Sequence, residues 1–164
     1  DLVSVDLGVR RVIKKNNNAT TVCVGAVDAE SARLCAVCEA ALAAGIAAAR
    51  AGNRIGDVGH AVQTVAEAAG FGVVRDFCGH GVGRKLHEDP QVPNFGIPGK
   101  GAVLKPGMTL AIEPMINQGT FQVDVMPNRW TVRTRDRKRS AHFEHTVLVR
   151  EAGPAEILTC AEKK

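Results

Sequence analysis

Apolar and polar residues alternate with a period of two at the start of the chain, which is the pattern of a half-buried β-strand. Residues 2–9 follow this pattern, and residues 12–13 continue it after a turn. The polar run 14–18 has the composition of a turn, and the β-branched stretch 20–24 is suited to the returning strand. The chain is therefore expected to open with a pair of strands.

Two helices are predicted next. Asp28 and Ser31 are suitable N-caps for a helix that continues to Arg50. A second helix is expected from about 55 or 57 to 69, where Gly70 stops it. Apolar residues at helical spacing form one stripe along this second helix: Val58, Ala61, Val62, Val65 and Ala69.

Beyond Gly72 the pattern changes to short β-rich segments separated by glycine and proline. The expected strands are 73–74, 108–113, 121–125, 131–134, 142–149 and 157–158. Residues 93–101 are expected to form a long loop. This order of a strand pair, two helices and a run of strands predicts an α+β fold with a mainly antiparallel sheet.

Composition places the chain among ordinary globular proteins, with 45% hydrophobic and 23% charged residues. Its 164 residues are expected to form a single domain over 1–164. The net charge of +4 is mild, and the densest basic stretch is 133–139. A solvated loop or hairpin is the favoured interpretation of this stretch, and a surface facing nucleic acid or the ribosome is the alternative.

The five cysteines have no paired spacing, which favours reduced thiols and a cytoplasmic protein. Cys35 and Cys38 form a CxxC pair, but it lies in an alanine-rich helical pattern without a second pair or a nearby histidine. No signal peptide is recognised at the start of the chain. The longest apolar run, near 40–49, is judged too short to span a bilayer, so no membrane association is expected.

Four polar residues lie in apolar or glycine-rich surroundings: His80, His87, Glu113 and Glu144. Burying one carboxylate without a partner is costly, and burying two together favours a cation between them. Carboxylates with an imidazole and an open face are what a hydrolytic metal site requires. The leading hypothesis from these residues is hydrolysis at a metal centre.

Four motifs together resemble the type I methionine aminopeptidases: Cys-Gly-His-Gly, Leu-His-Glu-Asp-Pro, Ile-Glu-Pro-Met and Phe-Glu-His-Thr. The resemblance extends from Asp6 to about Thr159, and each motif alone would be weak. It implies the pita-bread fold, a curved and mainly antiparallel sheet covered by helices. No large insertion separates the motifs, which favours type I over type II, while proline-specific peptidases of the same fold are a minor alternative.

The resemblance also implies a ligand set. Asp6, His80, Glu113 and Glu144 match the family's metal ligands, with Glu144 bridging two divalent ions of cobalt, manganese, iron or zinc. The family has a second bridging aspartate eleven residues after the first, and here that position is Asn17. An amide oxygen carries no charge and bridges poorly, so the resemblance leaves open whether one ion or two bind.

Other roles follow from the same resemblance. His87 matches the histidine that contacts the substrate and stabilises the oxyanion, and Glu113 is expected to shuttle a proton to the leaving amine. Cys78 and Trp130 match residues that line the pocket for the methionine side chain, although Trp130 by itself is more typical of a core. The remaining histidines, His60, His142 and His145, are expected to be structural.

The implied activity is removal of the N-terminal methionine from peptides and nascent proteins by a monomeric cytoplasmic enzyme, with ribosome association as a further expectation. Family members carry an N-terminal segment before Asp6, so the chain is expected to be an N-terminally truncated relative with impaired activity. A non-catalytic pita-bread module with a degraded metal site is the alternative.

Overall fold

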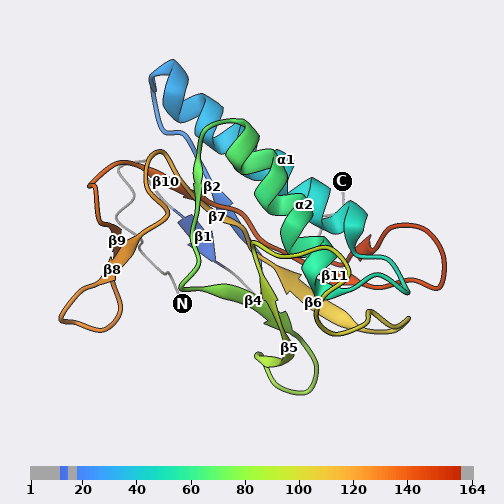
Figure 1. The fold of residues 1–164 in the computed structure, drawn as a ribbon. Coiled ribbons are helices and arrows are strands. Elements are labelled where there is room, and N and C mark those ends of the chain that lie inside the picture. Colours follow the sequence, from blue (N-terminus) through green and yellow to red (C-terminus); the bar gives the residue numbers. More distant parts are fainter. Residues whose placement is uncertain (1–11, 15–17, 160–164) are drawn as a thin grey trace.

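The computed structural model describes residues 12–14 and 18–159, and Figure 1 shows their arrangement. Two helices, α1 (Ala29–Ala48) and α2 (Ile55–Ala68), lie side by side across one face of the strands. The described strands form two sheets and two separate hairpins, and every described pairing between them is antiparallel. The predicted α+β class is therefore confirmed.

In the five-stranded sheet the spatial order of the strands differs from their order along the chain. The five-stranded sheet runs β12 (Glu156–Ile157), β11 (His145–Leu148), β6 (Thr109–Ile112), β4 (Cys78–Gly81) and β5 (Glu88–Pro93). The three-stranded sheet runs β10 (Ser140–His142), β7 (Met115–Asn117) and β3 (Gly72–Val73). The hairpins pair β1 (Val12–Lys14) with β2 (Ala19–Thr21), and β8 (Val123–Val125) with β9 (Val132–Thr134).

Helix α1 begins where the sequence predicts. The Asp28 carboxylate accepts a hydrogen bond from the Ser31 backbone N–H at 2.9 Å, which satisfies a donor at the helix start. The two helices approach closely at Gly45, where a Cβ atom would lie 2.8 Å from Val62 Cγ2. Any larger residue at this position would push α1 away from α2.

The two halves of α1 cover different sheets. Leu34 and Cys38, in its first half, belong to the buried cluster that includes Ile116 of the three-stranded sheet. Leu42 and Ile46, further along, belong to the cluster beneath the five-stranded sheet. Burial of these side chains supplies most of the stability of such a fold, at roughly 25 cal/mol per Å² of apolar surface. The helix thus fastens both sheets to one core.

Helix α1 is long and apolar enough, by length and composition, to cross a membrane. The apolar run near 40–49 is only the last part of this helix, which begins at Ala29. Its buried residues, however, pack on α2 and the sheets. This is how the central helix of a globular core is used.

The chain crosses between the two sheets at two places. It leaves β6, passes Glu113 and Pro114, and enters β7; it leaves β10, passes Phe143 and Glu144, and enters β11. Residues 142–149 were predicted as one strand, and this was wrong. Both glutamates therefore lie at the seam between the sheets, and not inside continuous strands.

Three strands escaped prediction: β4, β5 and β7. Strand β4 is rich in glycine, yet a Cβ on Gly79 would lie 2.1 Å from the Ala111 backbone oxygen, so the close pairing with β6 requires glycine there. Glu88 and Asp89 begin β5, because pairing with β4 overrides the weak preference of acidic residues for strands.

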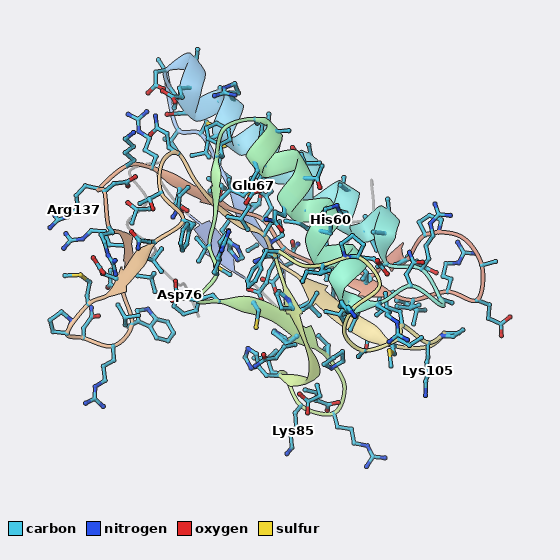
Figure 2. All side chains as sticks on the ribbon, viewed as in Figure 1. His60, Glu67, Asp76, Lys85, Lys105 and Arg137 are labelled. Carbon is cyan, nitrogen blue, oxygen red and sulfur yellow. The ribbon has the colours of Figure 1, made fainter. Side chains whose placement is uncertain are left out.

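The basic stretch 133–139 ends β9 and forms an exposed turn. Arg135 pairs with Asp124 at 3.1 Å, and Arg139 contacts Asp28 at the start of α1. Figure 2 shows Arg137 projecting away from the body of the molecule, as Lys85 and Lys105 also do. The structure agrees with the solvated turn that the composition favoured.

Candidate metal centre

His80 is held inside the five-stranded sheet, opposite Ala111 of β6. Its ring nitrogen Nδ1 lies 2.8 Å from the Gly81 backbone oxygen, so a proton on Nδ1 is donated to that carbonyl. The other ring nitrogen, Nε2, is buried and makes no hydrogen bond to any described residue. It lies 3.6 Å from Glu113 Oε1. A buried nitrogen of this kind requires a partner such as a cation.

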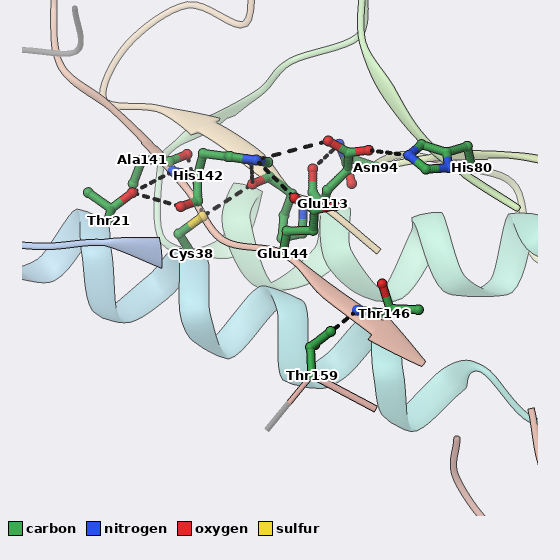
Figure 3. A network of polar contacts seen from close by, with 11 residues as sticks. Thr21, Cys38, His80, Asn94, Glu113, Ala141, His142, Glu144, Thr146 and Thr159 are labelled. Atoms are coloured by element: carbon green, nitrogen blue, oxygen red, sulfur yellow. Dashed lines mark hydrogen bonds and ion pairs between the residues drawn. The ribbon is translucent and has the colours of Figure 1, made fainter. Parts of the chain in front are cut away.

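Glu113 follows β6 directly and is only 6% exposed. The Asn94 side chain donates a hydrogen bond to the Glu113 backbone oxygen at 3.0 Å, which fixes the chain at the seam. Figure 3 shows the Glu113 carboxylate between two imidazoles, with Oε1 towards His80 and Oε2 towards His142 at 3.9 Å.

Glu144 is completely buried. Its backbone N–H donates to the Ala19 oxygen at 2.8 Å, and its backbone oxygen accepts from the Ala19 N–H at 3.3 Å. This bridge attaches the first hairpin to the seam. The Glu144 carboxylate oxygen Oε2 lies 4.0 Å from His142 Nε2.

Ligand-type atoms of His80, Glu113 and Glu144 all lie within 4.8 Å of one another. Three of the four residues that the sequence singled out are thus brought together from β4 and the two crossings between sheets. Asp6 and Asn17, the other predicted ligands, lie outside the described residues. Whether each residue ligates a metal stays a prediction.

The donor set fits a divalent cation. Two buried carboxylates that lie close together repel each other, and a cation between them would remove this cost. Carboxylate oxygens and neutral imidazole nitrogens are ligands that zinc, cobalt, manganese and iron accept.

The cluster opens into a cavity of about 400 Å³. His80, Glu113 and His142 are among its polar lining residues, and apolar side chains form much of the rest: Val74, Phe77, Met115, Val123, Val125, Trp130 and Val132. A largely apolar pocket with a few convergent polar groups is the usual form of a small-ligand site.

The predicted pocket residues Cys78 and Trp130 both line this cavity. Trp130 is 58% exposed, so it is not the core residue that its type alone suggested. Burial, and then the nearby Glu113 charge, raises the pKa of the Cys78 thiol. Cys78 therefore presents an uncharged, polarisable sulfur to the cavity.

His87 is exposed and also lines the cavity. Its ring centroid lies 4.1 Å from that of His80. It therefore lies close to the cluster and is accessible to solvent, and its contact with a bound substrate stays a prediction.

His142 was expected to be structural, but the structure places it beside the cluster. The sequence did contain a signal. His142 and Glu144 are two residues apart in a β-rich segment, and this spacing favours the same side of an extended chain. By contrast, His60 is exposed on α2, and His145 contacts Thr159 through Nδ1 at 2.9 Å.

Comparison with known proteins identifies relatives. Residues 1–151 match metallopeptidase family M24. A methionine aminopeptidase of Clostridium perfringens is 48% identical over 97% of this chain, and one of Clostridium acetobutylicum is 44% identical over 99% of it. The crystal structure of a methionine aminopeptidase from Thermotoga maritima has a TM-score of 0.85 at 47% identity over 91% of the chain.

The chain spans 64% of the length of both clostridial relatives and 61% of the Thermotoga chain. The resemblance to methionine aminopeptidases and the pita-bread fold expected from the four motifs are confirmed by these matches. Because the family is a metallopeptidase family, divalent metal binding is implied for the cluster at the seam. The chain belongs to metallopeptidase family M24.

Proposed function

We propose that the protein is a metal-dependent aminopeptidase that removes the N-terminal methionine from peptides and nascent proteins. The observation that carries this proposal is the convergence of His80, Glu113 and Glu144 beside an apolar cavity. Relatives named methionine aminopeptidase match 97–99% of the chain, which supports the same activity.

The ligands proposed among the described residues are His80, Glu113 and Glu144, and Asp6 and Asn17 are added by the family pattern. Bound divalent ions would supply Lewis acidity and lower the pKa of the attacking water. The residues of the chain would hold these ions beside the cavity. We propose two ions, with the second more weakly held because Asn17 has no charge.

The cavity supports recognition of the methionine side chain. Its volume of about 400 Å³ exceeds what one side chain needs, so a peptide backbone can share it. Trp130 offers an aromatic ring, and Cys78 and Met115 offer polarisable sulfur. Contacts of sulfur with aromatic rings are favourable by about 0.3–1.5 kcal/mol each.

Two residues are proposed to act on the scissile amide. Glu113 would take the proton from the attacking water and deliver it to the leaving amine. His87 would donate a hydrogen bond to the carbonyl oxygen as negative charge develops on it. The ring of His87 lies beside that of His80 and lines the cavity, which supports this role.

The test is hydrolysis of a Met-Ala-Ser peptide by the purified protein with added manganese or cobalt, read as free methionine. Cleavage should be abolished by a chelator and by Glu113→Gln, but not by Glu67→Gln, which changes an exposed carboxylate on α2. An Asn17→Asp variant should tighten binding of the second ion and raise activity. A metal-loaded Asn17→Asp protein that releases no methionine contradicts the proposal.

A non-catalytic binding module is the second candidate, and Asn17 is the observation that favours it. Calorimetric titration with manganese separates the two candidates. A stoichiometry near zero favours the module, and one or two ions per chain favours the enzyme.

The cellular setting is proposed on the same basis. We infer that residues 1–164 act as one catalytic domain of a monomeric cytoplasmic protein that meets nascent chains. The exposed basic turn 133–139 is the surface through which ribosome association would be tested, by reversing its charges and measuring ribosome co-sedimentation at low and moderate salt.

A further inference from the structure

We propose that His142 is a further ligand of the metal centre, and that its Nε2 atom coordinates a divalent cation together with Glu113 and Glu144. The inference rests on the proposed function, because it assumes that the cluster binds metal. It adds a residue outside the predicted ligand set and changes the chemistry of that set.

The distances favour ligation over a direct ion pair. His142 Nε2 lies 3.9 Å from Glu113 Oε2 and 4.0 Å from Glu144 Oε2. A charged hydrogen bond between imidazole and carboxylate would close to about 2.7–2.9 Å. In a tetrahedral zinc site, two ligand atoms at about 2.1 Å from the ion lie about 3.4 Å apart. The observed separations are about half an ångström longer than this, so a small inward movement of the side chains would let all three atoms reach one ion.

The orientation of the ring agrees with this role. His142 Nδ1 lies 3.2 Å from the Pro114 backbone oxygen, so a proton on Nδ1 is donated there and the lone pair of Nε2 faces the carboxylates. His80 has the same arrangement with the Gly81 oxygen. Metal-binding histidines usually donate the second ring N–H to a carbonyl or carboxylate in this way.

The backbone of His142 is held firmly. Its N–H donates to Thr21 Oγ1 at 2.9 Å, and the Thr21 hydroxyl donates to the His142 oxygen at 2.7 Å. The residue also pairs with Met115 across β10 and β7. A buried ring on such a backbone is already positioned before any ion arrives, which favours tight binding.

The ligand set would then contain two imidazoles and two carboxylates among the described residues. The two oxygens of Glu113 face different imidazoles, His80 on one side and His142 on the other (Figure 3). Nitrogen ligands favour zinc, cobalt and iron over magnesium and calcium. The site is therefore expected to prefer these ions.

The experiment is zinc titration of the wild-type protein and of His142→Gln, with His60→Gln as control. His60 is an exposed histidine on α2 whose ring contacts Thr64, so its replacement leaves the centre intact. The zinc dissociation constant should rise about 10- to 100-fold in His142→Gln and stay unchanged in His60→Gln. In wild-type protein labelled with ¹⁵N-histidine, the His142 Nε2 resonance should shift on zinc binding.

The outcomes separate this inference from the proposed function. If wild type and His142→Gln bind zinc equally well and the His142 resonance does not move, the inference is overturned. The proposed metal centre is unaffected by that result, and His142 then only lies beside its carboxylates. A wild-type protein that binds no zinc overturns both. The labelled wild-type spectrum decides the matter even if the His142→Gln variant does not fold.

An independent observation concerns two thiols, one in the segment that precedes α1 and one on α1 itself. We propose that Cys23 and Cys35 are a redox pair that closes to a disulfide under peroxide. Their sulfur atoms lie 3.8 Å apart, with Cys23 exposed and Cys35 buried on the helix. A disulfide bond is about 2.05 Å long, so closure needs an approach of less than 2 Å.

Cys38, the other cysteine of the CxxC pair, forms its hydrogen bonds with backbone oxygens and not with Cys35 or Cys23. The Cys38 thiol is buried and lies 3.5 Å from both the Pro114 and Ala141 oxygens.

Burial, and then the hydrogen bond with Cys23, raises the pKa of Cys35 to about 12, so the exposed Cys23 is the thiol that reacts first. Its thiolate would attack hydrogen peroxide, breaking the O–O bond and giving a sulfenic acid and, after protonation, water. The Cys35 sulfur then displaces hydroxide from Cys23, and the hydroxide leaves with the Cys35 proton as a second water.

Mass spectrometry of the peroxide-treated protein tests this pair. The intact mass should fall by two hydrogen atoms, a digest should contain a peptide that links Cys23 to Cys35, and dithiothreitol should reverse both changes. Cys23→Ser should abolish the link and Cys38→Ser should preserve it. A link between Cys35 and Cys38, or an oxidised Cys23 without any link, overturns the proposal.

Discussion

At the scale of single residues, the centre depends on backbone contacts that fix each side chain. His80 and His142 are both oriented by carbonyl oxygens, and Glu113 and Glu144 are held through Asn94 and Ala19. Fixed ligands do not have to be reordered when an ion binds, so little conformational entropy is lost. The negative charge of the two glutamates is then expected to determine how tightly the site binds a divalent ion.

The first prediction concerns that charge. Glu144→Gln keeps the size of the side chain but removes one of the buried anions, and the cation loses its electrostatic partner. The dissociation constant for manganese should rise at least about 100-fold, measured by calorimetric titration. Glu67→Gln, an equal chemical change on the surface of α2, should leave it unaltered. An unchanged constant in Glu144→Gln would remove that residue from the site.

Much of the site could be inferred at this scale from the sequence. Glu113 and Glu144 stand out because a carboxylate among apolar residues has few uses besides binding a cation. The spacing of His142 from Glu144 was a local hint that His142 lies near the site, but the contact of His142 with Glu113 depends on how the two sheets meet. Such a contact between distant segments has no local signal in the sequence.

At the scale of elements, β4 carries His80 into the site and has to lie unusually close to β6. The glycine at position 79 makes this possible, since a Cβ there would lie 2.1 Å from the Ala111 oxygen. The neighbouring residue, His80, pairs directly with Ala111. The position of the imidazole therefore depends on the absence of a side chain next to it.

The second prediction follows from this contact. Gly79→Ala should force β4 away from β6, displace His80 and weaken metal binding at least about 10-fold, and the melting temperature should fall. Gly25→Ala is the contrasting variant. The φ of +73° at Gly25 is strained for alanine and costs about 1–2 kcal/mol, but no neighbouring atom lies within 4 Å of the added Cβ. Thermal unfolding and zinc titration should therefore show a binding loss in Gly79→Ala alone. Equal zinc affinity in both variants would show that β4 tolerates the shift.

The start of α1 gives a prediction about pH. The backbone N–H of Ser31, and then the Arg139 side chain, lowers the pKa of Asp28 from 3.8 to about 2. A folded pKa below the unfolded value means that this contribution to stability is complete above about pH 4 and is lost as pH falls towards 2. Melting temperatures of wild type and Asp28→Asn should therefore differ above pH 4 and converge near pH 2.

Asp28→Ala provides the matched comparison. Asparagine can still accept the hydrogen bond of the helix start, whereas alanine cannot. Asp28→Ala should therefore be the less stable of the two variants at every pH. If Asp28→Asn and Asp28→Ala melt together, the cap contributes nothing beyond its charge.

The elements themselves show which local signals are reliable. Both helices were predictable, because caps and apolar stripes are local features that the structure retains at Asp28 and Gly70. Strands β4 and β5 were not, because glycine and acidic residues disfavour strands locally and only pairing with neighbours imposes the extended form. The sequence also did not reveal that β10 and β11 are separate strands, because this depends on their pairing with different neighbours.

At the scale of the whole molecule, the metal centre lies where the two sheets meet. Glu113 joins β6 to β7, Glu144 joins β10 to β11, and each crossing links the five-stranded sheet to the three-stranded one. Helix α1 spans the same seam on the side of the core. A cation bound to both glutamates would tie the two sheets together at a second place, independent of the helix.

The last prediction is that metal binding stabilises the entire fold. An ion that binds only the folded chain raises the free energy of unfolding by RT ln(1 + [L]/Kd), about 2.7 kcal/mol when the ion is at 100 times its Kd. For a protein of this size that corresponds to a rise in melting temperature of roughly 5–10 °C. Differential scanning calorimetry with a chelator and with saturating manganese measures it, and Glu144→Gln should lose most of the rise. Because the ligands belong to crossings between both sheets, the protein should still unfold in one transition. A metal-induced second transition would mean that the ion stabilises only one sheet, and that the seam is not shared in the way the structure indicates.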